Sequence, residues 1–286
     1  MGYLAIFAAA VLWGLIGPVS WLAFQEGLAP MEVAFFRALL AWVPFAIQAL
    51  YSRQIAFRLR DLLLFIPFGF VGITLFYAFY QLSVEANGAA LASVLLYTAP
   101  IWVVLLAPFF LGESLTGRRV AALGLAVAGV TLVSQAGPVK LNPLGLLFGL
   151  LSGLSYALYY LFGKRLLTGY PTAYIFFYAL PVGGLALFPL VQFHHKSLVA
   201  WGALLFLAFF STYGAYSAYF VGLRRLPASR AAILATLEPV VASFVAHLWW
   251  KERFTMLSAV GAFLVLLASL MGTLGDRCCS KGKGRV

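Results

Sequence analysis

Two ionisable side chains, Arg37 and Glu238, lie well inside long apolar runs of the sequence. A charged group at the centre of a membrane helix costs about 2.5–3.5 kcal/mol on insertion scales, so such groups usually face a bundle interior and serve a function. Glu238 could exchange protons or bind an amine, or it could be a structural carboxylate bonded to Arg37 or to helix backbone disturbed by Pro239. Arg37 could hold a carboxylate in a bidentate pair, although its depth favours a structural or gating residue that extends toward the lipid headgroups.

Aromatic and polar side chains with helical spacing form a second group of candidates. Residues at i, i+3 and i+4 share one side of a helix. A tyrosine within a membrane needs a hydrogen-bond partner, and aromatic faces attract ammonium groups, so a cavity lined by tyrosines would suit amphipathic solutes. Simple packing, or the aromatic belt at the membrane interface, is the alternative. The candidate cavity residues are Tyr77, Tyr80 and Gln81 on one face, Tyr213, Tyr216 and Ser217 on another, and Trp13, Tyr97, Trp102 and Tyr156.

The composition places these residues in a membrane. Of 286 residues, 64% are hydrophobic and 9% are charged, whereas soluble domains average roughly 45–50% and about 25%. This excludes a water-soluble enzyme, a disordered protein and a nucleic-acid-binding module. A bilayer core about 30 Å thick needs ~20 apolar residues per helix, and charges, prolines and glycines divide the chain into ten such segments. They cover residues 3–24, 31–50, 61–82, 88–111, 118–136, 143–163, 171–193, 199–221, 228–250 and 254–275.

The distribution of Lys and Arg predicts the orientation. With ten spans, most of these cations fall on the side that carries both termini, and the opposite loops hold Lys140, Lys196, Lys251 and Arg253. Because positive loops stay in the cytoplasm, we expect both termini to be cytoplasmic.

An internal repeat appears when the chain is shifted by 139 residues. Tyr77 then falls on Tyr216, Ala99-Pro100 falls on Glu238-Pro239, and Gly112-Glu113 falls on Lys251-Glu252. Each half holds five helices, and an odd number requires the second half to cross the membrane upside down, as in many secondary transporters. We therefore expect an all-α membrane protein with one repeat in residues 1–138, an inverted repeat in 139–275 and a basic cytoplasmic tail in 276–286.

The repeat also singles out residues at matching positions. Pro100 and Pro239 could each kink a helix to open or narrow a vestibule, or could be ordinary transmembrane prolines. Glu113 follows its helix at a membrane edge, where we expect it to cap a helix or to pair with a cation such as Arg118. The candidates for coupling or gating are thus Glu238, Arg37, Pro100 and Pro239.

These signatures resemble the drug/metabolite transporter superfamily, and within it the ten-helix EamA-type members. The resemblance covers nearly the whole chain, with one departure, Lys251, where the family usually has glycine. It rests on Trp13-Gly14, Pro30 and Arg37, on Leu96-Tyr97-Thr98-Ala99-Pro100 closing with Leu111-Gly112-Glu113, and on Leu237-Glu238-Pro239 closing with Lys251-Glu252.

The resemblance implies a secondary active transporter of the bacterial inner membrane. It would export small amphipathic metabolites, most of all amino acids including aromatic ones, by alternating access through a central aromatic cavity. An uncoupled, channel-like facilitator and an exporter of organic cations or drugs are the alternatives; a membrane enzyme and a lipid transporter are further ones. The expected direction of transport and its coupling to an energy source come from the resemblance alone.

Several motifs are missing from the sequence. It has no phosphate-binding loop of ATP-driven proteins and no hydrolase or metalloprotease signature. Its two cysteines, Cys278 and Cys279, are adjacent and lack metal-ligand spacing. We therefore expect no enzymatic activity, cofactor, metal, ATP or nucleic acid, and the expected partners are the bilayer and a small-molecule substrate.

Overall fold

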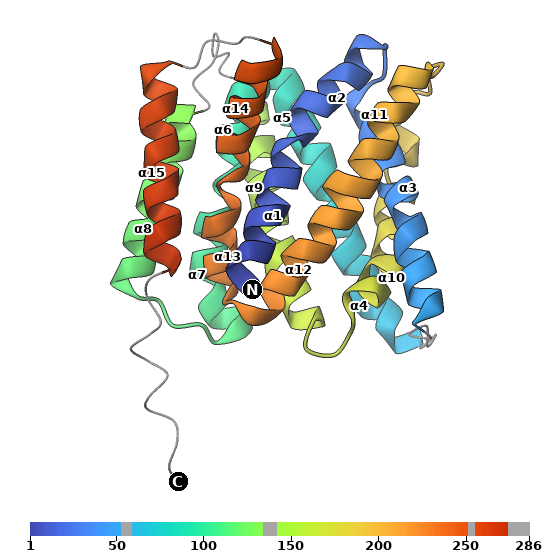
Figure 1. Ribbon diagram of the computed structural model, residues 1–286. Helices are drawn as coiled ribbons and strands as arrows, with labels where there is room; N and C mark the ends of the chain where they lie inside the picture. Colours follow the sequence, from blue (N-terminus) through green and yellow to red (C-terminus); the bar gives the residue numbers. More distant parts are fainter. Residues whose placement is uncertain (53–58, 134–141, 251–254, 274–286) are drawn as a thin grey trace.

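The computed structural model describes residues 1–52, 59–133, 142–250 and 255–273 (Figure 1). All regular structure in these ranges is helical. Eight helices are long and apolar enough to cross a membrane: Gly2–Gln25, Pro30–Tyr51, Asp61–Asn87, Leu91–Leu111, Pro143–Leu166, Thr172–Leu190, Leu198–Arg225 and Ala228–Trp249. The predicted all-α membrane fold is confirmed.

The two remaining expected spans are shorter helices in the described ranges. They are α8 (Gly117–Val133) and α15 (Met256–Thr273), which pack against each other. The basic tail at 276–286, Lys140, Lys251, Glu252 and Arg253 lie outside the described residues.

Most expected spans are divided into shorter elements. The first half contains α1 (Gly2–Gly14), α2 (Ile16–Gln25), α3 (Pro30–Tyr51), α4 (Leu59–Gly69), the π-helix η1 (Phe70–Leu75), α5 (Phe76–Asn87), α6 (Ala89–Leu96), α7 (Ala99–Leu111) and α8. The second contains α9 (Pro143–Leu166), α10 (Thr172–Leu185), the 3₁₀ turn η2 (Phe188–Leu190), α11 (Leu198–Ala208), the π-helix η3 (Phe209–Gly214), α12 (Ala215–Arg225), α13 (Ala228–Ala235), α14 (Glu238–Trp250) and α15.

The two halves place their irregularities at matching positions. Adding 139 to the bounds of η1 gives those of η3, and adding it to the bounds of α6 and α7 gives those of α13 and α14. Each half therefore has a π-helix within one span and a break within the next.

The main helix contacts join one half to the other. The pair α3 and α10 and the pair α8 and α15 each combine matching helices, while α5 packs on α9 and α1 packs on α12. In the figure these pairs run side by side through the bundle (Figure 1). In the repeat, α9 corresponds to α1 and α12 corresponds to α5. The α5–α9 contact is therefore the repeat-related equivalent of the α1–α12 contact.

Small residues allow α9 to approach the first half closely. A Cβ atom added at Gly153 would lie 2.5 Å from Thr98 Oγ1, in the break before α7, and 2.8 Å from the carbonyl oxygen of Leu95, in the last turn of α6. Nothing lies within 4 Å of a Cβ added at Gly124 on α8. Glycine at position 153 is therefore required by the packing.

We expect Gly153→Ala to destabilise the protein although alanine favours helix formation. Moving the backbone of α6 away from the new methyl group should cost about 1–3 kcal/mol in the free energy of unfolding. Thermal unfolding of the purified protein in detergent measures this, with Gly124→Ala as the matched control that should unfold at or above the wild-type temperature. Equal midpoints for the two variants would contradict the close approach.

Candidate functional site

The candidate residue Glu238 lies at a break in a membrane-spanning segment. Helix α13 ends at Ala235 and α14 begins at Glu238, as α6 ends at Leu96 and α7 begins at Ala99. Pro239 is the second residue of its helix, where the missing N–H removes no helical bond. Pro100 has the same place in α7. The two prolines thus begin short helices at a break, whereas the sequence placed each of them within one uninterrupted span.

Threonine hydroxyls satisfy carbonyl groups beside both breaks. Thr98 Oγ1 donates to the Leu95 carbonyl oxygen at 2.6 Å, and Thr236 Oγ1 donates to that of Ile233 at 2.6 Å. The same carbonyl oxygens also accept the backbone N–H groups of Thr98 and Thr236, at 3.1 and 3.2 Å. Each threonine thus donates twice to the last turn before the break, within a segment where backbone groups need partners inside the protein.

The Glu238 carboxylate lies near a cation and a phenol. It occupies the first turn of α14, where the helix dipole favours a negative charge, and its side chain stays partly accessible. Arg37 and the Tyr97 hydroxyl are the two groups whose electrostatic interaction with this carboxylate favours its charged form. The carboxylate can therefore exchange protons or bind a cationic group.

Arg37 points into the bundle and joins three elements. Its Nε donates to Thr212 Oγ1 at 2.7 Å, and its guanidinium carbon lies 5.2 Å from the centre of the Tyr77 ring. Thr212 belongs to η3 and donates in turn to the carbonyl oxygen of Leu207 at 2.9 Å. The remaining guanidinium donors are available to an anionic group.

The two repeat-related tyrosines meet between the halves. The hydroxyl oxygens of Tyr77 and Tyr216 are 3.2 Å apart, and both side chains are buried. Trp13 lies edge-on to Tyr216 with ring centres 6.1 Å apart, and to Tyr156 at 6.4 Å. Phe76 stacks on Tyr156 at 4.7 Å. Rings from α1, α5, α9 and α12 thus form one cluster around Arg37.

The other predicted cavity residues have varied surroundings. Tyr80 shares a hydrogen bond of 3.2 Å with Ser93, and Gln81 is half-buried. Trp102 Nε1 and Ser217 Oγ are buried and have no hydrogen-bond partner among the described residues. Tyr213 faces α3 instead of the cluster, because its ring contacts Phe45 at 4.7 Å and its hydroxyl donates to Gln48 Oε1 at 3.3 Å.

Three further tyrosines belong to this cluster. Tyr159, Tyr160 and Tyr219 are almost fully buried, and Tyr160 lies 5.0 Å from Tyr219 between ring centres. The sequence already places Tyr159 and Tyr160 beside Tyr156 among the aromatic candidates, and Tyr219 matches Tyr80 under the shift of 139 residues. No sequence signal singles out Thr212.

A second group of polar contacts lies at the end of the bundle that holds the N-terminus, called here the N-terminal face; Figure 1 marks this end. Glu113 accepts hydrogen bonds from the backbone N–H groups of Ala228 and Ser229 and, at 2.6 Å, from Ser229 Oγ. Its nearest cation is Arg119 at 3.7 Å, where the sequence offered Arg118 as an example of such a partner. Glu113 therefore caps α13 of the second half from the end of α7.

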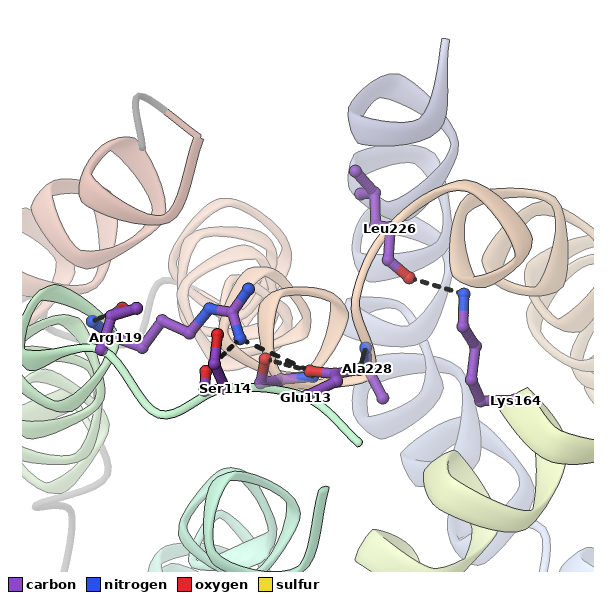
Figure 2. Close-up of polar contacts among 8 residues, drawn as sticks. Glu113, Ser114, Arg119, Lys164, Leu226 and Ala228 are labelled. Atoms are coloured by element: carbon purple, nitrogen blue, oxygen red, sulfur yellow. Dashed lines mark hydrogen bonds and ion pairs between the residues drawn. The ribbon is translucent and has the colours of Figure 1, made fainter. Parts of the chain in front are cut away.

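Lys164 holds the same turn from the other side. Its ammonium group donates to the carbonyl oxygens of Leu223 and, at 2.9 Å, Leu226. Figure 2 shows Glu113 reaching Ala228 and Lys164 reaching Leu226. The turn between α12 and α13 is thus fixed by both α7 and α9.

Comparison with known proteins identifies relatives over the whole chain. The sequence profile of the EamA-like transporter family matches twice, at residues 1–135 and 143–274. An "Uncharacterized transporter" of Archaeoglobus fulgidus is 29% identical over 84% of this chain and 87% of its own. A "Probable terminal-alkyne amino-acid exporter" of Streptantibioticus cattleyicolor is 25% identical over 98% and 97%.

Two further similarities complete the comparison. A "Probable amino-acid metabolite efflux pump" of Escherichia coli is 27% identical over 66% of this chain and 69% of its own. A solved crystal structure superposes with a TM-score of 0.82 over 96% of each chain at 18% identity, which shows a shared fold.

We expect Glu113→Gln to destabilise the N-terminal face. The amide would keep one acceptor but would direct an N–H group at the N–H donors of Ala228 and Ser229, leaving donors unsatisfied at a cost of about 1–3 kcal/mol. Thermal unfolding in detergent measures the loss, and Glu85→Gln, an exposed change on α5, is the control. If both variants unfold at the wild-type temperature, the cap does not stabilise the fold.

Proposed function

The chain belongs to the EamA-like transporter family, and we propose that it is a secondary active transporter that exports small amphipathic metabolites, first of all amino acids. The family makes it an integral membrane transporter and not an enzyme. The observation that carries the finer proposal is the central cluster, where Arg37 and Glu238 lie among buried tyrosines. The two relatives named as a probable amino-acid exporter and a probable amino-acid metabolite efflux pump support it.

The cluster offers each part of an amino acid a suitable partner. The free donors of Arg37 suit a carboxylate, Glu238 suits an ammonium group, and the rings of Trp13, Tyr156 and Tyr216 suit an apolar or aromatic side chain. Glu238 is also the first candidate for proton coupling. No phosphate-binding loop is present in the sequence, so we infer that ATP is not the energy source.

The halves 1–138 and 139–275 are proposed as inverted repeats that move against each other. The matching element bounds and the twofold pattern of helix contacts support this arrangement. In the state described, Glu113 joins the halves at the N-terminal face, and Lys164 holds the same turn from within the second half. Access to the cluster from that face requires the Glu113 bonds to break, which is what alternating access demands of one end at a time.

The first experiment is uptake of radiolabelled amino acids into proteoliposomes, with and without a pH gradient. We expect saturable uptake that is stimulated by counterflow. Glu238→Gln should reduce gradient-driven uptake at least tenfold because the amide cannot carry a proton, while Glu85→Gln should behave as wild type.

Three results would count against this assignment. Normal gradient-driven uptake by well-folded Glu238→Gln would remove the coupling role. Fast flux without counterflow stimulation would indicate an uncoupled facilitator. If no amino acid moves, organic cations form the next panel, and their uptake would replace the proposed substrate class.

We propose further that both termini are cytoplasmic in a bacterial inner membrane. The described cations gather at the N-terminal face, where Arg118, Arg119, Arg165, Arg224 and Arg225 lie close to the surface, and the positive-inside rule then assigns this face.

The native cysteines test this orientation, because Cys278 and Cys279 are the only two in the chain. A membrane-impermeant maleimide should label them in inside-out vesicles and leave intact spheroplasts unlabelled. Glu26→Cys, at an exposed turn on the opposite face, should add labelling in intact spheroplasts. The reverse pattern would invert the orientation.

A further inference from the structure

A pocket of about 650 Å³ opens at the N-terminal face beside the turn that Glu113 and Lys164 hold. It lies where α7, α9 and α12 end. Its wall consists of Phe110, Leu111, Glu113, Lys164, Arg165, Thr168, Arg225, Leu226 and Pro227. The central cluster described above contributes none of these residues.

The wall carries three cations and one carboxylate, and that carboxylate is already engaged. Both oxygens of Glu113 accept hydrogen bonds from α13, and Arg119 pairs with one of them. Lys164 directs its donors at carbonyl oxygens, so its positive charge meets no free carboxylate in the pocket. The pocket is therefore suited to an anion.

Two arginines supply the donors for such a ligand. Arg225 is exposed, and its guanidinium group makes no hydrogen bond or ion pair with another described residue. Arg165 uses one nitrogen for the carbonyl oxygen of Phe110 at 3.3 Å and leaves the rest of its guanidinium group open. Planar guanidinium groups match the oxygen atoms of a phosphate in pairs.

The rest of the wall is apolar. Phe110, Leu111, Leu226 and Pro227 border the arginines, so the ligand should combine an anionic group with an apolar part. Basic pockets between membrane helices at the cytoplasmic side are suited to anionic lipid headgroups. We propose that this pocket binds a phosphate group through Arg165 and Arg225, carried by an anionic phospholipid. The proposal is independent of the transported substrate.

A titration of the purified full-length protein in detergent tests the site. The probes are dioctanoyl-phosphatidylglycerol, dioctanoyl-phosphatidylcholine and inorganic phosphate, and binding is followed by microscale thermophoresis. We expect saturable binding of the phosphatidylglycerol. A basic residue near a membrane surface contributes about a fivefold factor, so Arg225→Gln should raise the Kd about fivefold and Arg165→Gln/Arg225→Gln about 25-fold.

Two variants serve as controls. Arg118→Gln removes an exposed cation at the same face outside the pocket and should leave the Kd unchanged. Arg225→Lys keeps the charge but loses the planar donor pair, so its Kd should lie between those of wild type and Arg225→Gln. The Arg225 guanidinium group bonds to no described residue, and the Arg225 variants should therefore unfold at the wild-type temperature.

The outcomes separate the possible ligands. Binding of phosphatidylglycerol without binding of inorganic phosphate supports a lipid headgroup. Competition by inorganic phosphate with the same dependence on Arg225 supports the phosphate site with a soluble ligand. An unchanged Kd for Arg225→Gln, or an equal loss for Arg118→Gln, overturns the proposal. So does phosphatidylcholine bound as tightly as phosphatidylglycerol.

Discussion

The absence of water in the bilayer core is the constraint on which this structure depends. Every backbone carbonyl and N–H group that leaves a regular helix there must find a partner within the protein. Both halves nevertheless contain a π-helix and a break, and threonines stand at all four places. Thr74 in η1 donates to Gly183 and Thr212 in η3 to Leu207, while Thr98 and Thr236 serve carbonyl groups beside the breaks.

The same irregular backbone positions the candidate site. Glu238 gains the start of a helix in mid-span because α13 ends before it, and Arg37 is held by a threonine of η3. A continuous helix would give Glu238 no helix terminus. Tyr77 and Tyr216, whose hydroxyl groups meet, each follow the π-helix of their own half by two residues. The breaks and π-helices therefore determine where the polar groups of the site lie.

The sequence predicts those features that depend on composition and on the repeat. Hydropathy identifies the spans, and the shift of 139 residues pairs Tyr77 with Tyr216 before any contact is known. The sequence does not predict where a π-helix interrupts the regular α-helical spacing of side chains. Tyr213 and Tyr216 are three residues apart, but Tyr213 lies in η3. The wider turn of a π-helix changes the direction of its side chain, and Tyr213 therefore faces α3.

Polar contacts between the halves occur at three depths. At the N-terminal face Glu113 caps α13, and at the opposite face the buried Glu32 of α3 contacts His194 at 2.8 Å and Lys196 at 2.6 Å in the loop before α11. Between them lie Tyr77–Tyr216 and Arg37–Thr212. Water can replace the partners of a bond at either face when it opens, but it cannot do so in the core without an open cavity. Movement of the proposed halves would therefore break the contacts at one face at a time and keep the central contacts as the pivot.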